Sequence, residues 1–194
     1  MTCHCFDREV NVAITAVREA TPIVLEVYRH DFGVELKHAR EPVTIADRKV
    51  NALLCQRFAT AFPEDGIVAE ESVPASASEL AAIVARPRVW FIDPLDGTKE
   101  FIARNGEFAI MIGLAVGGRA VLGVVATPVT GEVFAGVVGH GAWLLHDDGN
   151  RTPLRVSDVN SLGSAGLVKS RSHRSGKLQR VIDALGVQRQ VVSG

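Results

Sequence analysis

The hexapeptide Asp93-Pro94-Leu95-Asp96-Gly97-Thr98 places two carboxylates three residues apart in a turn. The apolar run over residues 89–92 predicts a buried strand that ends at these acids. The helical composition of residues 98–104 puts Gly97 and Thr98 at a helix N-terminus, where free N–H groups and the helix dipole favour a phosphate. Carboxylates beside a phosphate site suit a hard divalent cation. The alternative interpretation is a tight turn in which an Asp only caps the helix.

Two more acidic residues stand at the expected ends of elements. Asp47 opens a predicted helix, and Glu70 follows a short predicted strand. Side chains at such positions project past a rigid scaffold. Oxygen ligands without neighbouring His or Cys favour Mg²⁺ over zinc. Two such ions can hold the attacking water and the leaving oxygen of a phosphoryl transfer, so two or more Mg²⁺ ions are the expected cofactors.

The composition of the 194-residue chain, 47% apolar and 22% charged, is that of an ordinary globular protein. The sequence contains no apolar run as long as a membrane span and no secretion signal at its start. Its three cysteines suggest no disulfide framework. These features predict a cytoplasmic protein.

Charge is distributed unevenly along the chain. Residues 151–194 carry eight Lys and Arg against two acids, whereas residues 1–150 carry 13 Lys and Arg against 20 acids. An acidic part that collects cations and a basic part that faces anions fit a metal-dependent enzyme acting on a small phosphorylated substrate. The alternative is a merely uneven solvated surface, which charge alone does not exclude. The basic part lacks interleaved aromatic residues for base stacking, which argues against a nucleic-acid partner.

Hydrophobic periodicity predicts a first domain over residues 1–150. A long helix over residues 7–30 should be kinked or split by Pro22. A second helix covers residues 47–58, and a capped short helix covers residues 78–84. Four apolar runs with Gly-rich turns between them predict an antiparallel meander. These runs cover residues 108–116, 120–127, 132–138 and 142–145.

The polar loop over residues 147–150 is the expected domain boundary. After it, a strand over residues 166–170, a helix over residues 177–185 and a strand over residues 188–192 form the beginning of a βαβ unit. A lone unit of this kind leaves apolar faces and strand edges uncovered. We therefore expect residues 151–194 to be an incomplete substrate-binding α/β domain, completed by another chain or by the rest of a longer protein.

Together with the hexapeptide, several motifs resemble the signature of the inositol monophosphatase superfamily. They are Thr44-x-x-Asp47, Ala69-Glu70-Glu71-Ser72 and Ser170-Arg171-Ser172-His173. The continuations Lys99-Glu100-Phe101-Ile102 and Asn105-Gly106-Glu107-Phe108 resemble the 3'(2'),5'-bisphosphate nucleotidases of the CysQ type. Agreement among several separate motifs argues against the turn-only interpretation.

This resemblance implies a mixed α+β or α/β fold with the layered α-β-α-β arrangement of sugar phosphatases. Its N-terminal antiparallel sheet would carry two helices, and the second α/β domain would be incomplete. The implied activity is a Mg²⁺-dependent, lithium-sensitive hydrolysis of 3'-phosphoadenosine 5'-phosphate to AMP and phosphate, which clears a by-product of sulfate assimilation. A homodimer is possible in such a family. The alternatives are an inositol-phosphate phosphatase and a truncated, non-catalytic remnant of this family.

The resemblance also implies a role for each matching residue. Glu70, Asp93 and the carbonyl of Leu95 would hold a first Mg²⁺, and Asp93 with Asp96 a second. Thr98, paired with Asp47, would orient and deprotonate the water that attacks phosphorus. The full set implied to contact the substrate is Glu70, Leu95, Asp96, Gly97, Thr98, Ser170, Ser172 and His173.

One motif of the family has no counterpart in this sequence. Family members carry, beyond the region that matches residues 166–192, a Trp-Asp-x-Ala-Ala-type motif whose Asp completes the second metal site. Ile182-Asp183-Ala184-Leu185 lies within a predicted helix and is no substitute. The resemblance therefore implies that this chain binds its second metal weakly or not at all.

Overall fold

The computed structural model describes residues 6–30, 34–36, 42–171, 176–187 and 189–193. The chain divides into two compact units, Met1–Leu154 and Arg155–Gly194. The first unit contains a seven-stranded sheet in the order β3-β4-β5-β6-β7-β8-β9. Strands β3 and β4 are parallel, and all later neighbours are antiparallel. The strands are β3 Gly66–Ala69, β4 Arg88–Asp96, β5 Ala109–Val116, β6 Arg119–Thr127, β7 Glu132–Val137, β8 Gly141–Leu145 and β9 Arg151–Leu154.

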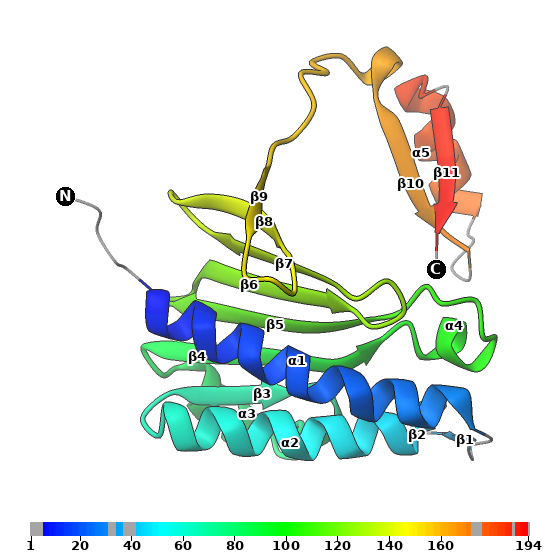
Figure 1. The fold of residues 1–194 in the computed structure, drawn as a ribbon. Helices are drawn as coiled ribbons and strands as arrows, with labels where there is room; N and C mark the ends of the chain where they lie inside the picture. Colours follow the sequence, from blue (N-terminus) through cyan, green and yellow to red (C-terminus); the bar gives the residue numbers. More distant parts are fainter. Residues whose placement is uncertain (1–5, 31–33, 37–41, 172–175, 188, 194) are drawn as a thin grey trace. The chain divides into compact units, whose positions relative to one another are not determined.

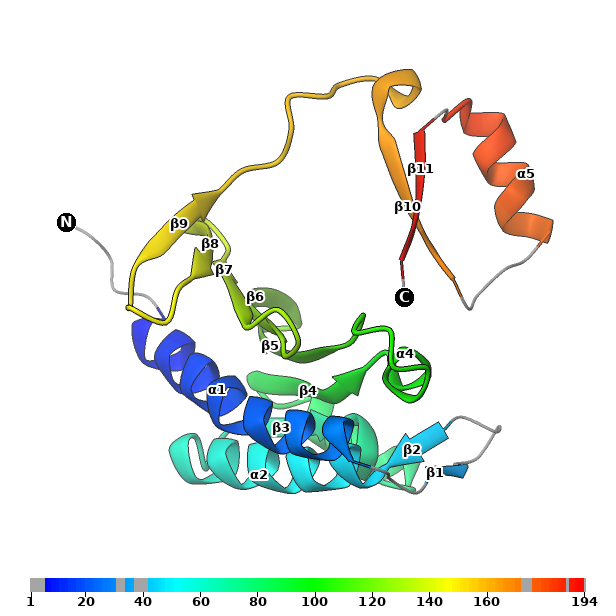
Figure 2. The ribbon, with the colours of Figure 1, turned by 45° about the vertical axis from the view of Figure 1, so that its right-hand side comes forward.

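Helices α1 (Asp7–Arg29) and α2 (Ile45–Ala61) run side by side over one face of this sheet (Figures 1 and 2). The helix–sheet layer forms because each strand directs alternate side chains at the helices. On β4, Trp90 and Ile92 are buried beneath them, whereas Phe91 between these two is 43% exposed on the opposite face. The predicted antiparallel meander is confirmed, and it lies within a mixed sheet because β3 joins it in parallel.

Helix α1 continues through Pro22 as a single helix, so the predicted split does not occur. Proline removes one backbone donor, but the residues around it are held by packing. Val17, Ala20 and Val24 are completely buried in the helix–sheet core. Burial of these apolar side chains offsets the lost hydrogen bond and keeps the helix intact.

Shorter elements complete the first unit. They are the antiparallel pair β1 (Val34–Leu36) and β2 (Pro42–Thr44), the 3₁₀ turn η2 (Glu70–Ser72), α3 (Ala77–Val84) and α4 (Thr98–Ile102). The predicted capped helix over residues 78–84 begins at Ala77, and its cap is Ser76, whose hydroxyl accepts from Glu79 N. No helix of the described segments is long and apolar enough to cross a membrane.

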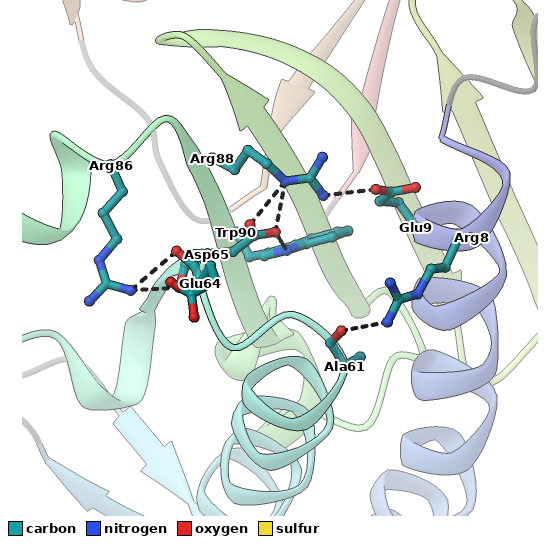
Figure 3. Close-up of polar contacts among 8 residues, drawn as sticks. All are labelled: Arg8, Glu9, Ala61, Glu64, Asp65, Arg86, Arg88 and Trp90. Atoms are coloured by element: carbon teal, nitrogen blue, oxygen red, sulfur yellow. Dashed lines mark hydrogen bonds and ion pairs between the residues drawn. The ribbon is translucent and has the colours of Figure 1, made fainter.

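The amino-terminal end of β4 is fixed by a partly buried polar network (Figure 3). Arg88 Nε donates to both carboxylate oxygens of Asp65 at 2.9 and 3.1 Å, and its Nη2 donates to Glu9 at 2.8 Å. Trp90 Nε1 also donates to Asp65, at 2.8 Å. The network joins α1, the residues after α2 and β4, so it holds this strand against both helices.

The second unit contains strand β10 (Gly166–Ser170), helix α5 (Gly176–Leu185) and strand β11 (Arg189–Ser193), with the short turn η3 (Leu162–Ser164) before them. The two strands are parallel, with Gly166 opposite Arg189. A helix between two parallel neighbours is the βαβ arrangement that the sequence predicts.

Candidate active site

Two acidic residues from separate segments meet because β3 and β4 are parallel. The carboxyl ends of parallel strands lie at the same edge of a sheet. Ala69, the last residue of β3, pairs with Ile92 of β4, so Glu70 and Asp93 follow the paired residues directly. Their carboxyl groups are close enough to share a hydrogen bond. The predicted convergence of Glu70 and Asp93 is therefore present.

A bulge in β4 brings the third acid to the same corner. The pairing of β4 with β5 shifts register between Asp93, opposite Met111, and Asp96, opposite Ala109. Pro94 within this stretch has no N–H to give to a sheet ladder. Leu95 N donates instead to Asp93 Oδ1 at 3.1 Å and closes a short turn. Bulges of this kind often redirect side chains beside active sites.

The three carboxyl groups repel one another. Burial, the charges of Glu70 and Asp96, and the hydrogen bond that the protonated Asp93 carboxyl donates to Glu70 raise the pKa of Asp93 to about 7. Burial and the charges of Glu70 and Glu100 also raise the pKa of Asp96, opposed by a hydrogen bond from Gly97 N–H. Such raised pKa values are typical of functional sites, because the fold must gather like charges there.

The donor set fits magnesium. Among the described residues, no three His, Cys, Asp or Glu side chains are arranged so that they could enclose a metal ion. The predicted ligand sets need only two acidic side chains each, with the Leu95 carbonyl oxygen added for the first ion. Magnesium commonly takes one or two carboxylates and keeps several waters, and a divalent cation would relieve the repulsion that raises the pKa of Asp93.

Asp47 and Thr98 form a hydrogen-bonded pair beside this corner. Thr98 Oγ1 lies 3.3 Å from Asp47 Oδ1 and 3.2 Å from the Leu95 carbonyl oxygen, so its single hydrogen faces two acceptors. Asp47 is 1% exposed although it is an acid. The pairing places one hydroxyl between a buried carboxylate and the carbonyl of a predicted metal ligand.

Thr44 completes this pair, and it had no predicted role of its own. Its N–H and its hydroxyl donate to Asp47 Oδ2 at 2.7 and 2.6 Å, which leaves Oδ1 for Thr98. Thr44 Oγ1 also accepts from Ala46 N at 3.2 Å and caps α2. The sequence signal for this role is the capping-box spacing of a Thr with an acid three residues later.

Gly97 is required by the turn for two reasons. Its φ is +86°, a backbone conformation that L side chains rarely adopt. A Cβ at this position would also lie 2.9 Å from the Glu107 carbonyl oxygen. Its N–H donates to the Asp96 carboxylate, so a phosphate at this position would have to share or displace that bond.

The remaining predicted site residues belong to the second unit. Ser170 is the last residue of β10. Ser172 and His173 lie outside the described residues. Their predicted contacts with a substrate stay predictions. Helix α4 ends at Ile102 instead of Arg104, because Arg104 has a φ of +55°.

Comparisons of the sequence and of the fold with known proteins find similar proteins of the same kind. Residues 7–190 match the description "Inositol monophosphatase family". The 3'(2'),5'-bisphosphate nucleotidase CysQ of Salmonella typhimurium is 35% identical over 173 residues, which cover 87% of this chain and 66% of that protein. Human inositol monophosphatase 1 is 32% identical over 160 residues, covering 82% of this chain and 55% of that protein.

The fold matches a solved relative as well. The crystal structure of CysQ from Bacteroides thetaiotaomicron aligns with a TM-score of 0.75 and 28% identity over 98% of this chain and 74% of that chain. In the sequence comparison, the chain spans just under two thirds of the length of the CysQ relative from Salmonella typhimurium. With the motif order, the layered fold and the family match in agreement, the chain belongs to the inositol monophosphatase family.

Proposed function

We propose that this chain forms the metal-binding part of a magnesium-dependent phosphomonoesterase that hydrolyses the 3'-phosphate of 3'-phosphoadenosine 5'-phosphate to AMP and phosphate. The observation that carries the proposal is the gathering of Glu70, Asp93 and Asp96 next to the hydrogen-bonded pair Thr98 and Asp47. Carboxylates that raise one another's pKa beside a held hydroxyl suit metal-assisted hydrolysis of an anionic ester.

In this proposal Glu70, Asp93 and the Leu95 carbonyl hold one Mg²⁺, and Asp93 with Asp96 holds a second more weakly. When bound, Mg²⁺ would lower the pKa of the attacking water and stabilise charge on the leaving oxygen. Because Thr44 saturates Asp47 Oδ2, Asp47 Oδ1 is the oxygen that accepts the Thr98 proton. The Thr98 oxygen can then take a proton from the water and pass its own to Asp47.

The substrate assignment rests on similarity to proteins with the CysQ name. The continuation Lys99-Glu100-Phe101-Ile102 resembles theirs, and the CysQ protein of Salmonella typhimurium is named a 3'(2'),5'-bisphosphate nucleotidase. In this proposal Ser170, Ser172 and His173 contact the nucleotide, and the N–H groups of Gly97 and Thr98 bind the phosphate that is cleaved. The identity with human inositol monophosphatase 1 keeps an inositol phosphate as the competing substrate.

The test measures phosphate release by this chain from 3'-phosphoadenosine 5'-phosphate and from inositol 1-phosphate, with and without Mg²⁺ and with added lithium. We expect Mg²⁺-dependent, lithium-inhibited release that is faster from the nucleotide. Thr98→Ala should lower kcat by about 100-fold, the lower end of the range for general acid–base groups. Thr60→Ala, on the exposed part of α2, is the matched control.

Three results would contradict the proposal in different ways. Faster release from inositol 1-phosphate would overturn the substrate class. Mg²⁺ binding without turnover of either ester would favour a chain that binds metal and does not catalyse. Full activity of Thr98→Ala would remove the proposed role of its hydroxyl.

A further inference from the structure

Helix α2 presents a second polar side chain toward the site, one turn after Asp47. Asn51 follows Asp47 by four residues and Cys55 follows Asn51 by four, so the three lie on one face of the helix. Asn51 is 9% exposed, which is unusual for an amide without a specific task. Buried amides of this kind are held by hydrogen bonds, and their partners show what they position.

The partner of Asn51 is the turn that carries Glu70. Asn51 Nδ2 donates to Ser72 Oγ at 3.2 Å. Cys55 Sγ lies 3.9 Å from Asn51 Oδ1 as a donor and 3.8 Å from Ser72 Oγ. Because the thiol donates to the amide oxygen, the amide nitrogen is the group that faces Ser72. The three side chains form one contact between α2 and η2.

Ser72 is the last residue of the three-residue turn η2, and Glu70 is the first. In so short a turn the position of one end sets the position of the other. We propose that Asn51 is a positioning residue that, through Ser72, holds the Glu70 carboxylate against Asp93 in the geometry that Mg²⁺ requires. This inference rests on the proposed Mg²⁺ site and adds to it a residue outside the ligand set.

The consequence is that one rigid helix aligns both halves of the site. Asp47 fixes Thr98, which follows β4, and Asn51 fixes the turn that follows β3. Residues that orient metal ligands typically change metal affinity by 10–100-fold when they are removed. A single neutral hydrogen bond acting through a turn should fall at the low end, at about 10-fold.

The experiment compares Mg²⁺ binding by isothermal titration calorimetry for the unaltered chain, Asn51→Ala, Ser72→Ala and the double variant. Thermal melts by circular dichroism first establish a temperature at which every variant is folded. We expect each single variant to raise the Mg²⁺ dissociation constant by about 10-fold. The double variant should bind no worse than the weaker single one, because both changes break the same contact.

Gln56→Ala is the matched control, since it removes an amide from the same helix where it lines a groove between α1 and α2. A general loss of helix stability would lower thermal stability without a selective loss of Mg²⁺ affinity. If Asn51→Ala fails to fold, Ser72→Ala, at an exposed residue, still decides the question.

Unchanged Mg²⁺ affinity in Ser72→Ala would overturn the inference while leaving the metal site itself intact. Effects that multiply in the double variant would also overturn it, because the two residues would then act separately. Failure of the unaltered chain to bind Mg²⁺ would instead overturn the proposed metal site, and the inference with it.

Discussion

Acidic side chains have opposite surroundings at the two ends of strand β4. At the amino-terminal end, Asp65 accepts from Arg88 and Trp90, and Arg88 also pairs with Glu9 (Figure 3). At the carboxyl-terminal end, Asp93 faces the carboxyl groups of Glu70 and Asp96, and its pKa rises to about 7. The first arrangement is complete within the protein, whereas the second becomes favourable only when a cation joins it.

This difference separates residues that serve folding from residues that serve function. Removing the partner of a paired, buried acid destabilises the folded protein, because the charge that remains is buried and unpaired. An acid held among other acids lowers stability in the absence of metal, so its presence calls for a functional reason. Substitutions at the two ends should therefore change stability in opposite directions, and only those at the carboxyl-terminal end should weaken metal binding.

The largest expected effect follows from Asp93→Asn. Removing a carboxylate shared by both proposed metal positions should weaken Mg²⁺ binding by at least about 100-fold, at or beyond the upper end for residues that only orient ligands. The same change should raise the metal-free free energy of unfolding at pH 8, because it relieves repulsion from Glu70 and Asp96. Calorimetric titration and urea denaturation measure the two effects. A less stable variant with normal Mg²⁺ affinity would contradict the comparison.

Asp65→Asn should lower stability and leave Mg²⁺ binding as it is. Breaking a buried ion pair costs about 3–5 kcal/mol. Because the Arg88 side chain is 31% exposed and keeps Glu9, we expect the free energy of unfolding to fall by about 2 kcal/mol. Urea denaturation measures the loss, and Mg²⁺ affinity should stay unchanged. A selective loss of Mg²⁺ affinity would show that the network acts on the site.

Gly97→Ala should lower the free energy of unfolding by about 1–3 kcal/mol. The substitution combines a strained φ with a Cβ 2.9 Å from the Glu107 carbonyl oxygen. Gly118→Ala is a matched control, since Gly118 has a φ of +75° with nothing within 4 Å of an added Cβ. The difference between the two variants in urea denaturation isolates the clash. Equal losses in the free energy of unfolding for the two variants would mean that the turn at Gly97 adjusts to hold the added methyl group without a clash.

The smallest expected effect is a pH dependence of metal-free stability. Since the pKa of Asp93 is raised from 3.8 to about 7 in the folded state, the folded chain holds a proton that the unfolded chain has released. The free energy of unfolding should therefore fall as pH rises from about 4 to 7. The slope should stay well below the ceiling of about 1.4 kcal/mol per pH unit, because water screens this half-exposed group.

Added Mg²⁺ should oppose this trend, since the cation binds the ionised form that dominates above pH 7. Thermal shift on addition of Mg²⁺ should be larger at pH 8 than at pH 5.5. Asp93→Asn, as the control, should lose the Mg²⁺-dependent shift and much of the metal-free slope, and the raised pKa of Asp96 accounts for the part of the slope that remains. A Mg²⁺ shift independent of pH would place the cation away from Asp93.

Local signals in the sequence predicted the turn well. The apolar run before Asp93 and the Pro94 and Gly97 signals are properties of adjacent residues. The structure ends β4 at Asp96, next to Gly97, so the strand continues past the predicted end at residue 92 through a bulge. The bulge between Asp93 and Asp96 was beyond such signals, because it is set by pairing with β5. The convergence of Glu70 with Asp93 was expected from element ends and family resemblance, and periodicity alone would not have required it.

Two kinds of feature left no usable pattern. Strand β9 is exposed along its length and contains Pro153, so it shows neither alternation nor an apolar run. The network at the start of β4 joins Arg88 to Asp65 and Glu9, which are 23 and 79 positions away. Such contacts depend on tertiary packing, which spacing along one segment does not reveal.

The parallel pairing of β3 with β4 has a consequence for how the chain folds. The connection between these strands is a crossover that contains α3, and closing so long a connection is slower than closing a hairpin. Misregistered or unpaired intermediates would keep Glu70 away from Asp93 and hold magnesium poorly. Magnesium that binds Glu70 and Asp93 together would thus stabilise only molecules in which β3 and β4 are paired, so its uptake during refolding would report on this pairing.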